Sequence, residues 1–274
     1  MTDSADRNFD ELAQRFARRV YGGLKGEIRL AVLWADLQPA LAELSQRRGD
    51  SLRVLDVGGG LGQLAVRLAE RGHDVVYNDL SPVMLEQARH RARTCGVELA
   101  IEWICAPYQS LLQAPIGSLP QGGDPMPGFD LILCHALLEW LEEPELLVPA
   151  LASLLRPGGY LSLCFYNPAA KTYRNLIRGN FDWLNQEQAY RSDAGSLTPN
   201  NPSSLQQVRE WLRQSQLEVT SESGLRVFHD YVVEKRGGHQ SPEQVLEMEL
   251  RYSREEPFKW LGRYLHLMAR RALD

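Results

Sequence analysis

The feature that most constrains the fold is an apolar stretch, a run of glycines and an amphipathic segment in immediate succession. Residues 52–55 are mostly apolar and branched, as buried parallel strands are. Four glycines follow, at Gly58, Gly59, Gly60 and Gly62. Apolar residues then recur with helical spacing, at Leu64, Ala65, Leu68 and Ala69. A strand that turns through glycines into a helix presents free N–H groups at the carboxyl edge of a sheet, so we predict a ligand site there.

The acidic residues around the glycines indicate the kind of ligand. The glycine spacing, G-x-G-x-G, is tighter than the dinucleotide fingerprint. Asp56 precedes the glycines, and Asp79 ends the next apolar run, 21 residues after Gly58. At that distance a carboxylate reaches the ribose hydroxyls of a bound nucleoside. The pattern therefore predicts a nucleoside-containing cofactor, and an ordinary tight turn between strand and helix is the alternative.

Alternation of strand and helix patterns predicts an α/β fold with a doubly wound, Rossmann-like parallel sheet. The expected strands are 53–57, 74–78, 98–105, 129–135 and 160–166, and the expected helices between them are 62–71, 82–95 and 137–155. A turn is expected at 156–159, and a long surface loop rich in proline and glycine at 114–128.

The two ends of the chain depart from this alternation. Residues 1–50 are expected to form two helices, 8–21 and 25–44, that cap the cofactor site. Residues 51–274 form the main domain, with a substrate-binding insertion at about 167–203. The C-terminal elaboration is expected to comprise a helix at 204–214, a strand at 218–223, a helical region from 241 and a last strand near 264–269.

Charge and composition exclude several classes of protein. The formal net charge of −5 argues against a generally basic nucleic-acid-coating protein, although residues 171–274 are close to neutral, at +1. The four cysteines lack metal-binding pair spacing, and we expect no metal. No signal segment opens the chain and no apolar run is long enough to span a membrane, so we expect a cytoplasmic protein.

Polar residues at expected strand ends are candidates for the site, each with a plainer alternative. His135 either contacts the cofactor or hydrogen-bonds a helix start, and the residues do not decide between the two. Arg29 suits bidentate recognition of a carboxylate, and a solvated arginine on the helix face is the default alternative. Tyr166 and Asn167 either point at a substrate or cap a turn. Residues 224–231, G-L-R-V-F-H-D-Y, suit an anionic, aromatic substrate or form a strand with one polar face.

The combination D-x-G-G-G-x-G…D resembles the S-adenosylmethionine site of class I methyltransferases. This resemblance implies that Asp56 lies near the amino-acid end of the cofactor and that Asp79 holds the ribose. It also implies an adenine contact at Ala106 and Pro107, with an ordinary loop as the alternative, and it places His135 beside the methionine part.

Further blocks occur along nearly the whole chain: K-G-x-x-R at 25–29, H-A-x-L-E-W at 135–140, F-Y-N at 165–167, G-N-F-D at 179–182 and G-x-R-V-F-H-D-Y at 224–231. Together they resemble one specific family, the bacterial tRNA 5-carboxymethoxyuridine methyltransferases. The resemblance implies methyl esterification of the carboxymethoxy group on the wobble uridine of a tRNA anticodon stem-loop. Arg226, His229, Tyr231 and Tyr166 are then the expected substrate-binding and catalytic residues.

An ionised carboxylate needs no general base to attack a methyl group, which agrees with the lack of an obvious base and nucleophile pair in the sequence. Two other functions remain open. One is a methyltransferase for a small carboxylic acid or quinone-type metabolite, and the other is a non-catalytic cofactor-binding subunit that presents tRNA to a partner. The sequence leaves the oligomeric state open.

Overall fold

The structure is a computed structural model that describes residues 22–113, 128–185, 199, 201–232 and 241–273. The expected helix over 8–21 lies outside these residues, and so does nearly all of the expected loop at 114–128. Among the helices of the described residues, none is both long and apolar enough to cross a membrane.

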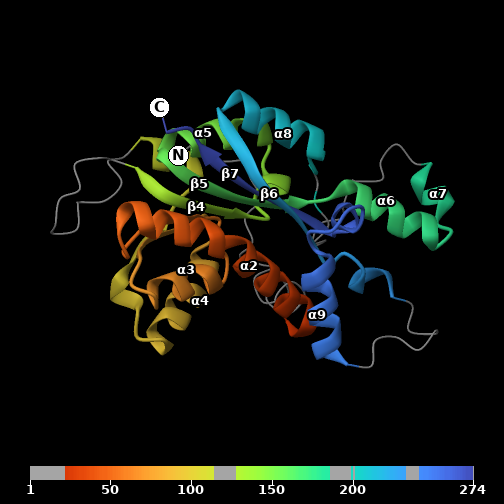
Figure 1. Cartoon of the computed structure of the whole chain (residues 1–274), viewed down its shortest axis with the longest axis horizontal. Coiled ribbons are helices and arrows are strands. Elements are labelled where there is room, and N and C mark those ends of the chain that lie inside the picture. Colours follow the sequence, from red (N-terminus) through yellow and green to blue (C-terminus); the bar gives the residue numbers. More distant parts are fainter. Residues whose placement is uncertain (1–21, 114–127, 186–198, 200, 233–240, 274) are drawn as a thin grey trace.

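Seven strands form one sheet in the order β3-β2-β1-β4-β5-β7-β6 (Figure 1). Neighbours pair in parallel except at β7, which is antiparallel to both β5 and β6. The strands are β1 (Arg53–Val57), β2 (Asp74–Asp79), β3 (Ile101–Cys105), β4 (Phe129–His135), β5 (Leu155–Tyr166), β6 (Leu217–Leu225) and β7 (Tyr264–Arg271). The predicted α/β, Rossmann-like class is confirmed.

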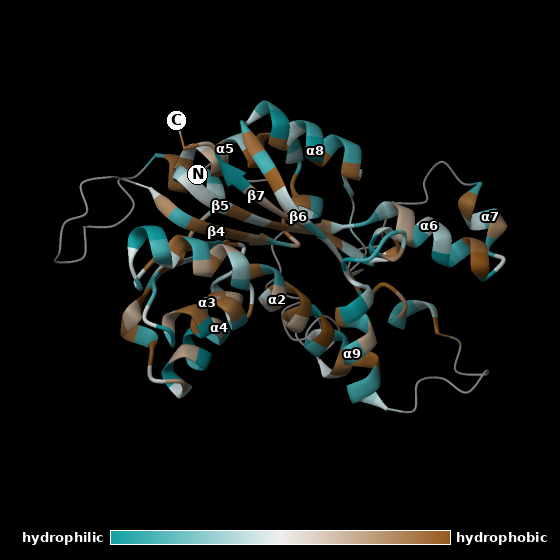
Figure 2. Ribbon diagram, in the orientation of Figure 1, coloured by the Kyte–Doolittle hydropathy of each residue, from teal (hydrophilic) through white to brown (hydrophobic). Residues whose placement is uncertain are grey.

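Helices cover both faces of the sheet, and they bury two separate cores (Figure 1). In β1, for example, Val54 belongs to one core and the next residue, Leu55, to the other, because successive strand residues point to opposite faces. One face carries α2 (Gly23–Arg48), α3 (Gln63–Ala69), α4 (Pro82–Thr94) and α9 (Pro242–Tyr252), and the other carries α5 (Leu147–Leu154) and α8 (Leu205–Gln214). Figure 2 shows the apolar strands between these two layers.

Two expected elements are shorter in the structure. The strand expected from Glu98 begins at Ile101, after a 3-10 turn at Glu98–Ala100. The helix expected over 137–155 is helical in the α sense only at Leu147–Leu154, after 3-10 turns at Leu138–Trp140 and Pro144–Leu146. Proline at 144 lacks the N–H that a continuous helix needs. The carbonyl of Leu141, just before this proline, accepts a hydrogen bond from the Asn201 side chain at 3.2 Å.

The prediction of a turn at 156–159 is wrong, because β5 runs without a break from Leu155 to Tyr166. The strand pairing shifts there: Phe129 of β4 is opposite Leu155, but Leu131 is opposite Tyr160. The turn-forming residues therefore make a bulge inside the strand. A Cβ at Gly159 would lie 3.0 Å from two backbone carbonyl oxygens, so glycine allows the two backbones to approach.

After β5 the chain leaves the sheet through α6 (Pro168–Ile177) and α7 (Phe181–Leu184), which extend to one side in Figure 1. The Asn167 side chain caps α6 by accepting a hydrogen bond from the N–H of Ala169, at 3.1 Å. Pro168 occupies the first helical position, where its missing N–H costs nothing. Both helices lie in the stretch that the sequence analysis assigned to a substrate-binding insertion.

The sheet topology brings several strand ends to one edge. The parallel strands β1, β2, β4 and β5 end there, and β6 ends there as well because it is antiparallel to the reversed β7. Tyr264, the first residue of β7, is paired with Tyr166 on one side and with Leu225 on the other. Polar residues far apart in the sequence are thus collected at the carboxyl edge.

At the opposite edge, Asp130 ties β1 to the bulge of β5. Its buried carboxylate accepts from the N–H of Arg53 at 2.8 Å and from Arg156 Nη1 at 3.1 Å. Replacing Asp130 with alanine removes the acceptor of a buried guanidinium. We expect Asp130→Ala to lower the free energy of unfolding by about 3–5 kcal/mol, measured by urea denaturation.

Asp74→Ala is the matched control, because that carboxylate lies 3.8 Å from Arg53 Nε and is partly exposed. We expect it to cost less than about 1 kcal/mol. Equal losses in the two variants would contradict the role given to Asp130.

Candidate cofactor and substrate site

The glycine loop after β1 is closed tightly against β2 and α4. A Cβ at Gly59 would collide with the ring of the buried Tyr77. Gly62, at the start of α3, has a φ of +68°, and a Cβ there would lie 2.7 Å from that of Ala88. The Tyr77 hydroxyl donates to the carbonyl of Gly60 at 2.5 Å. The loop shape therefore depends on glycine, which lacks the side chain that would fill these contacts.

Asp79, at the end of β2, holds the glycine loop in place through a hydrogen bond to its backbone. One carboxylate oxygen accepts from the N–H of Gly60 at 2.9 Å, and the other accepts from the N–H of Ser81 at 2.8 Å. The carboxylate is held beside the glycines by these two bonds. The ribose contact expected of Asp79 stays a prediction.

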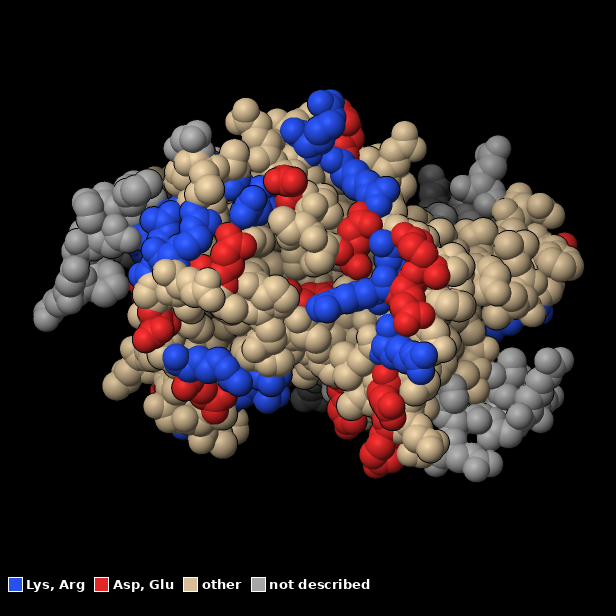
Figure 3. Space-filling model, in the orientation of Figure 1, with Lys and Arg blue, Asp and Glu red and all other residues tan. Residues whose placement is uncertain are grey.

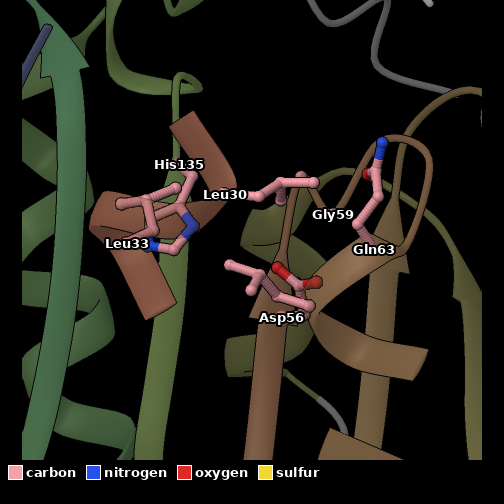
Figure 4. A pocket seen from close by; sticks show the side chains of 8 residues that line it. Leu30, Leu33, Asp56, Gly59, Gln63 and His135 are labelled. Atoms are coloured by element: carbon pink, nitrogen blue, oxygen red, sulfur yellow. The ribbon is translucent and has the colours of Figure 1, made fainter. Parts of the chain in front are cut away.

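A pocket lies beside the loop, between β1, β4 and α2 (Figure 4). Its lining comprises Leu30, Leu33, Asp56, Gly58, Gly59, Gln63, Leu64 and His135. The structure therefore brings together Asp56, two of the predicted glycines and His135. This helix, α2, was expected to cap the cofactor site, but Leu30 and Leu33 were not named as candidates. Apolar spacing predicts a buried face without saying which of its residues line a pocket.

Asp56 is the acidic group of this pocket, and it is only 4 % exposed. Burial raises its pKa to about 7, and the neighbouring charge of Asp79 adds to the shift. A cation placed beside Asp56 would stabilise the ionised carboxylate. The pocket thus suits a positively charged ligand group.

His135 enters the pocket from the end of β4 (Figure 4). Burial, then the charges of His266 and Arg29, hold the pKa of His135 well below its usual value, so its ring is neutral. Its Nε2 lies 2.8 Å from Ser162 Oγ of β5. The alternative role expected for His135 was a hydrogen bond to the start of a helix. At Nε2 the partner is instead a strand residue, Ser162.

Arg29 lies deeper, on α2, and is 3 % exposed. Its guanidinium stacks on the ring of Tyr264, 4.4 Å from the ring centre. Its charge acts on His135 and on the buried Glu139, whose pKa burial raises to about 7. Arg29 is therefore a buried residue beside the pocket and not a solvated helix residue.

Ala106 and Pro107 follow β3 at the same sheet edge. The N–H of Ala106 donates to the carbonyl of Asp79 at 3.2 Å, and its own carbonyl accepts from the Asn78 side chain at 2.8 Å. These bonds place the two residues beside the end of β2. The adenine contact expected from them remains a prediction.

The loop after β6 is held in shape by a buried carboxylate. Glu249 of α9 accepts from the backbone N–H groups of Val227, Phe228 and His229, at 2.7, 3.2 and 2.8 Å. Arg226 has a φ of +58°. This loop is therefore a fixed turn beside the sheet edge, not the strand that was its alternative.

The predicted substrate residues lie around this turn and the end of β5. Arg226 pairs with Asp230 at 3.4 Å. The Tyr231 hydroxyl donates to the carbonyl of Leu261 at 2.6 Å, and burial raises its pKa to about 12. Tyr166 is buried, with the guanidinium of Arg263 stacked on its ring at 4.8 Å. They occupy the same edge as the cofactor pocket, and their roles stay predictions.

Cations around α6 form a group that the sequence analysis missed, which we call the α6 cation cluster: Lys171, Arg174, Arg178 and Arg263. Burial and Arg263 lower the pKa of Lys171 to about 8. Burial, Arg178 and Arg263 lower that of Arg174. Such mutual repulsion is relieved by a bound anion. In the sequence, the spacing of Lys171, Arg174 and Arg178 could have indicated that they share one face of a helix. No sequence pattern indicates that Arg263 joins them.

This cluster is a local feature of the charge distribution. On the face shown in Figure 3, Lys and Arg side chains interleave with Asp and Glu, so that face offers no extended area of one sign. Among the described residues no group of three or more metal-ligating side chains is found.

The carboxylate of Asp79 provides a direct test of the cofactor pocket. Asp79→Ala removes the acceptor that holds Gly60 and the predicted ribose ligand, so we expect S-adenosylmethionine to bind on the order of 10–100-fold more weakly. Isothermal titration calorimetry measures this. Asp74→Ala, at the other end of β2, is the control, and unchanged binding in Asp79→Ala would refute the assignment.

The raised pKa of Asp56 predicts a pH dependence. A cationic cofactor binds the ionised carboxylate, so binding releases a proton, and affinity falls below about pH 7 by up to roughly tenfold per pH unit. Titrations between pH 5.5 and 8 measure the slope. Asp56→Asn should bind weakly with a flat profile, and a wild-type profile in that variant would exclude Asp56 as the titrating group.

Comparisons with known proteins agree with this geometry. A methyltransferase domain model matches residues 55–163. The tRNA 5-carboxymethoxyuridine methyltransferase of Escherichia coli K12 is 42 % identical over 269 residues, which cover 97 % of each chain.

Solved structures share the fold at low sequence identity. Magnesium protoporphyrin IX methyltransferase from Synechocystis PCC 6803 superposes with a TM-score of 0.56 at 17 % identity, covering 96 % of both chains. An S-adenosylmethionine-dependent methyltransferase from Mesorhizobium loti gives 0.54 at 21 % identity, covering 91 % of this chain and all of the other.

These comparisons confirm the predicted fold and enzyme class, an S-adenosylmethionine-dependent methyltransferase. The E. coli relative is matched over nearly its whole length, and the predicted family is confirmed with it. The chain therefore belongs to the tRNA 5-carboxymethoxyuridine methyltransferase family.

Proposed function

We propose that this chain transfers a methyl group from S-adenosylmethionine to the carboxylate of 5-carboxymethoxyuridine at the wobble position of tRNA, giving the methyl ester. The observation that carries the proposal is the common sheet edge, where the cofactor pocket and the α6 cation cluster lie at neighbouring strand ends. The name of the E. coli relative supports the same acceptor. With a tRNA acceptor, we also propose that the chain acts in the cytoplasm.

The residues of the pocket suit the proposed cofactor. The glycine loop lets backbone approach it, Asp79 stands beside the loop for the ribose, and Asp56 offers a carboxylate to its positively charged end. When bound, S-adenosylmethionine supplies a methyl group on a positively charged sulfur. The chain's own task is to hold donor and acceptor in line and to exclude water.

The acceptor explains why a base is unnecessary. A carboxylate is ionised at neutral pH, so its oxygen attacks the methyl group directly and no proton is removed. Three of the predicted substrate residues, Arg226, Tyr231 and Tyr166, lie next to the α6 cation cluster. His229 belongs to the same loop as Arg226 and Tyr231. We assign recognition of the acceptor carboxylate to this part of the edge, because guanidinium groups suit carboxylates.

Ring contacts connect the two halves of the site. Arg29, beside the pocket, stacks on Tyr264, and Tyr264 packs edge-to-face on Tyr166 with ring centres 5.8 Å apart. Arg263 of the cation cluster also stacks on the ring of Tyr166. The pocket and the cluster therefore belong to one packed unit, which suits an acceptor that must reach the methyl group.

Exposed aromatic side chains favour an RNA acceptor over a small metabolite. Tyr173 on α6 is 41 % exposed and Phe181 on α7 is 58 % exposed, next to the cations at 171, 174 and 178. Single-stranded RNA loops are recognised by stacking of their bases on such rings, and phosphates by nearby cations. A small acid would need a cation for its carboxylate but not the exposed rings.

Methyl transfer to bulk tRNA tests the proposal. The purified chain is incubated with labelled S-adenosylmethionine and tRNA from a strain lacking this gene, and the nucleosides are then separated. We expect label in the methyl ester of 5-carboxymethoxyuridine. Cofactor binding without labelled nucleoside would refute the tRNA assignment. Activity that appears only with a second protein would instead support a non-catalytic subunit.

Arg263 provides the matching variant. Arg263→Ala should lower kcat/KM for tRNA by about tenfold or more and reduce the salt dependence of tRNA binding by roughly one counterion, while S-adenosylhomocysteine binding stays unchanged. Steady-state kinetics at several salt concentrations measure both effects. Arg213→Ala, an exposed arginine paired with Glu210 on α8, is the control. Equal effects in both variants would exclude a specific role for Arg263.

A further inference from the structure

Glu249 of α9 is a buried carboxylate without a cation beside it. It is 0 % exposed, and no Lys, Arg or His side chain pairs with it in the part of the chain that the structure describes. The charge that acts on it is that of Asp230, which has the same sign. A buried carboxylate is costly unless other partners compensate for the lost water. The partners of Glu249 therefore have to be hydrogen-bond donors.

Three consecutive backbone N–H groups of the loop after β6 are these donors. The N–H of Val227 donates to Glu249 Oε2 at 2.7 Å, and those of Phe228 and His229 donate to Oε1 at 3.2 and 2.8 Å. Successive N–H groups that converge on one point form a concave anion-binding site, which we call the N–H cradle. Glu249 fills the cradle from a helix that begins after the loop, so the conformation of the loop is tied to α9.

The residue just before the cradle has an unfavourable backbone conformation. Arg226 has a φ of +58°, which a residue with a Cβ adopts only where its surroundings hold it there. Its guanidinium lies 5.6 Å from the ring centre of Tyr264, and Arg29 of the cofactor half stacks on the same ring at 4.4 Å. Arg226 thus lies where the cofactor and acceptor halves of the site meet, and the cradle begins at the next residue.

We propose that Glu249 is a positioning residue for the methyl acceptor: by filling the N–H cradle it keeps the loop in the conformation that places the Arg226 guanidinium over Tyr264. Glu249 is fully buried and does not line the cofactor pocket, so it acts through the loop and not on a ligand. The inference rests on the proposed function, in which Arg226 belongs to the acceptor half. It adds that this half is ordered before tRNA arrives, so that binding does not bear the entropy cost of ordering it.

Glutamine at position 249 separates the carboxylate from the shape of the side chain. Burial raises the pKa of Glu249, while the three N–H groups lower it by favouring the ionised form. Glutamine has nearly the same size but one acceptor oxygen, and its amide nitrogen would face an N–H donor. Glu249→Gln therefore deprives at least one N–H group of the cradle of its acceptor, and it opens no cavity.

Hydrogen exchange followed by NMR measures the cradle without any substrate. We expect the amides of Val227, Phe228 and His229 to be protected in the wild-type chain alone, and to exchange at least about tenfold faster in Glu249→Gln. The amide of Gly60, which donates to the carboxylate of Asp79, is the internal control and should not change. Fast exchange of the three cradle amides in the wild-type chain would overturn the proposal even if the variant did not fold.

Steady-state kinetics with tRNA test the positioning role. A loosened loop is competent for only a fraction of the time, and the apparent affinity falls by that fraction. We expect Glu249→Gln to raise KM for tRNA by about tenfold while kcat changes by less than about threefold, because bound tRNA reorders the loop. S-adenosylhomocysteine binding, measured by calorimetry, should stay unchanged, since Glu249 does not line the cofactor pocket.

Asp130→Asn is the matched control for a loss of stability. Asp130 is also a buried carboxylate that accepts from a backbone N–H, that of Arg53 at 2.8 Å, but it lies at the opposite edge of the sheet. We expect this variant to lose stability and keep the wild-type KM. A wild-type KM in folded Glu249→Gln, or an equal rise in both variants, would refute the positioning role. If the wild-type chain methylates no tRNA, the proposed function fails and not the cradle, which hydrogen exchange tests by itself.

Discussion

The reversal of β7 is the constraint on which the site depends. A sheet of β1–β5 alone would present only the glycine loop, Asp79, the loop after β3 and the ends of β4 and β5 at its carboxyl edge. Because β7 is antiparallel to both of its neighbours, β6 again runs parallel to β5, and its end delivers the loop from Arg226 to Tyr231 to the same edge. Tyr264 then lies between Arg29 and Tyr166. Cofactor and acceptor regions become neighbours through this one strand.

Buried carboxylates perform different tasks around that edge. Asp36 and Glu249 are satisfied by hydrogen bonds, and they hold a histidine and a loop in place. Asp56 and Glu139 have a raised pKa of about 7 because burial disfavours their charge. A group that gains little from its surroundings is available to gain from a ligand. Burial raises the pKa of Glu249 as well, so what distinguishes Asp56 is its place in the pocket lining, whereas Glu249 is engaged by the backbone of the loop after β6.

Local sequence patterns predict the cofactor half of the site, because short stretches of consecutive residues form it. The glycine loop and Asp79 are signalled by a strand, a turn and a distance along the chain, and the structure brings them together. Short-range exceptions were missed where a few residues decide the outcome, as at Pro144 and at the bulge before Tyr160.

Contacts between residues far apart in the chain could not be predicted from local sequence patterns. Asp36 and His266 are 230 residues apart in the chain, and only the pairing of β7 with β5 brings the histidine to α2. The partners of Arg263 and Glu249 depend on the same topology. No periodicity marks such residues, because their neighbours are set by the whole sheet.

The most direct test of the account is a crystal structure of the chain with S-adenosylhomocysteine and an anticodon stem-loop that carries 5-carboxymethoxyuridine. The account predicts the cofactor between the glycine loop and His135, with the uridine carboxylate pointing from the α6 cation cluster toward its sulfur. A carboxylate bound at another edge of the sheet, or an anticodon loop that contacts neither α6 nor Arg263, would contradict it.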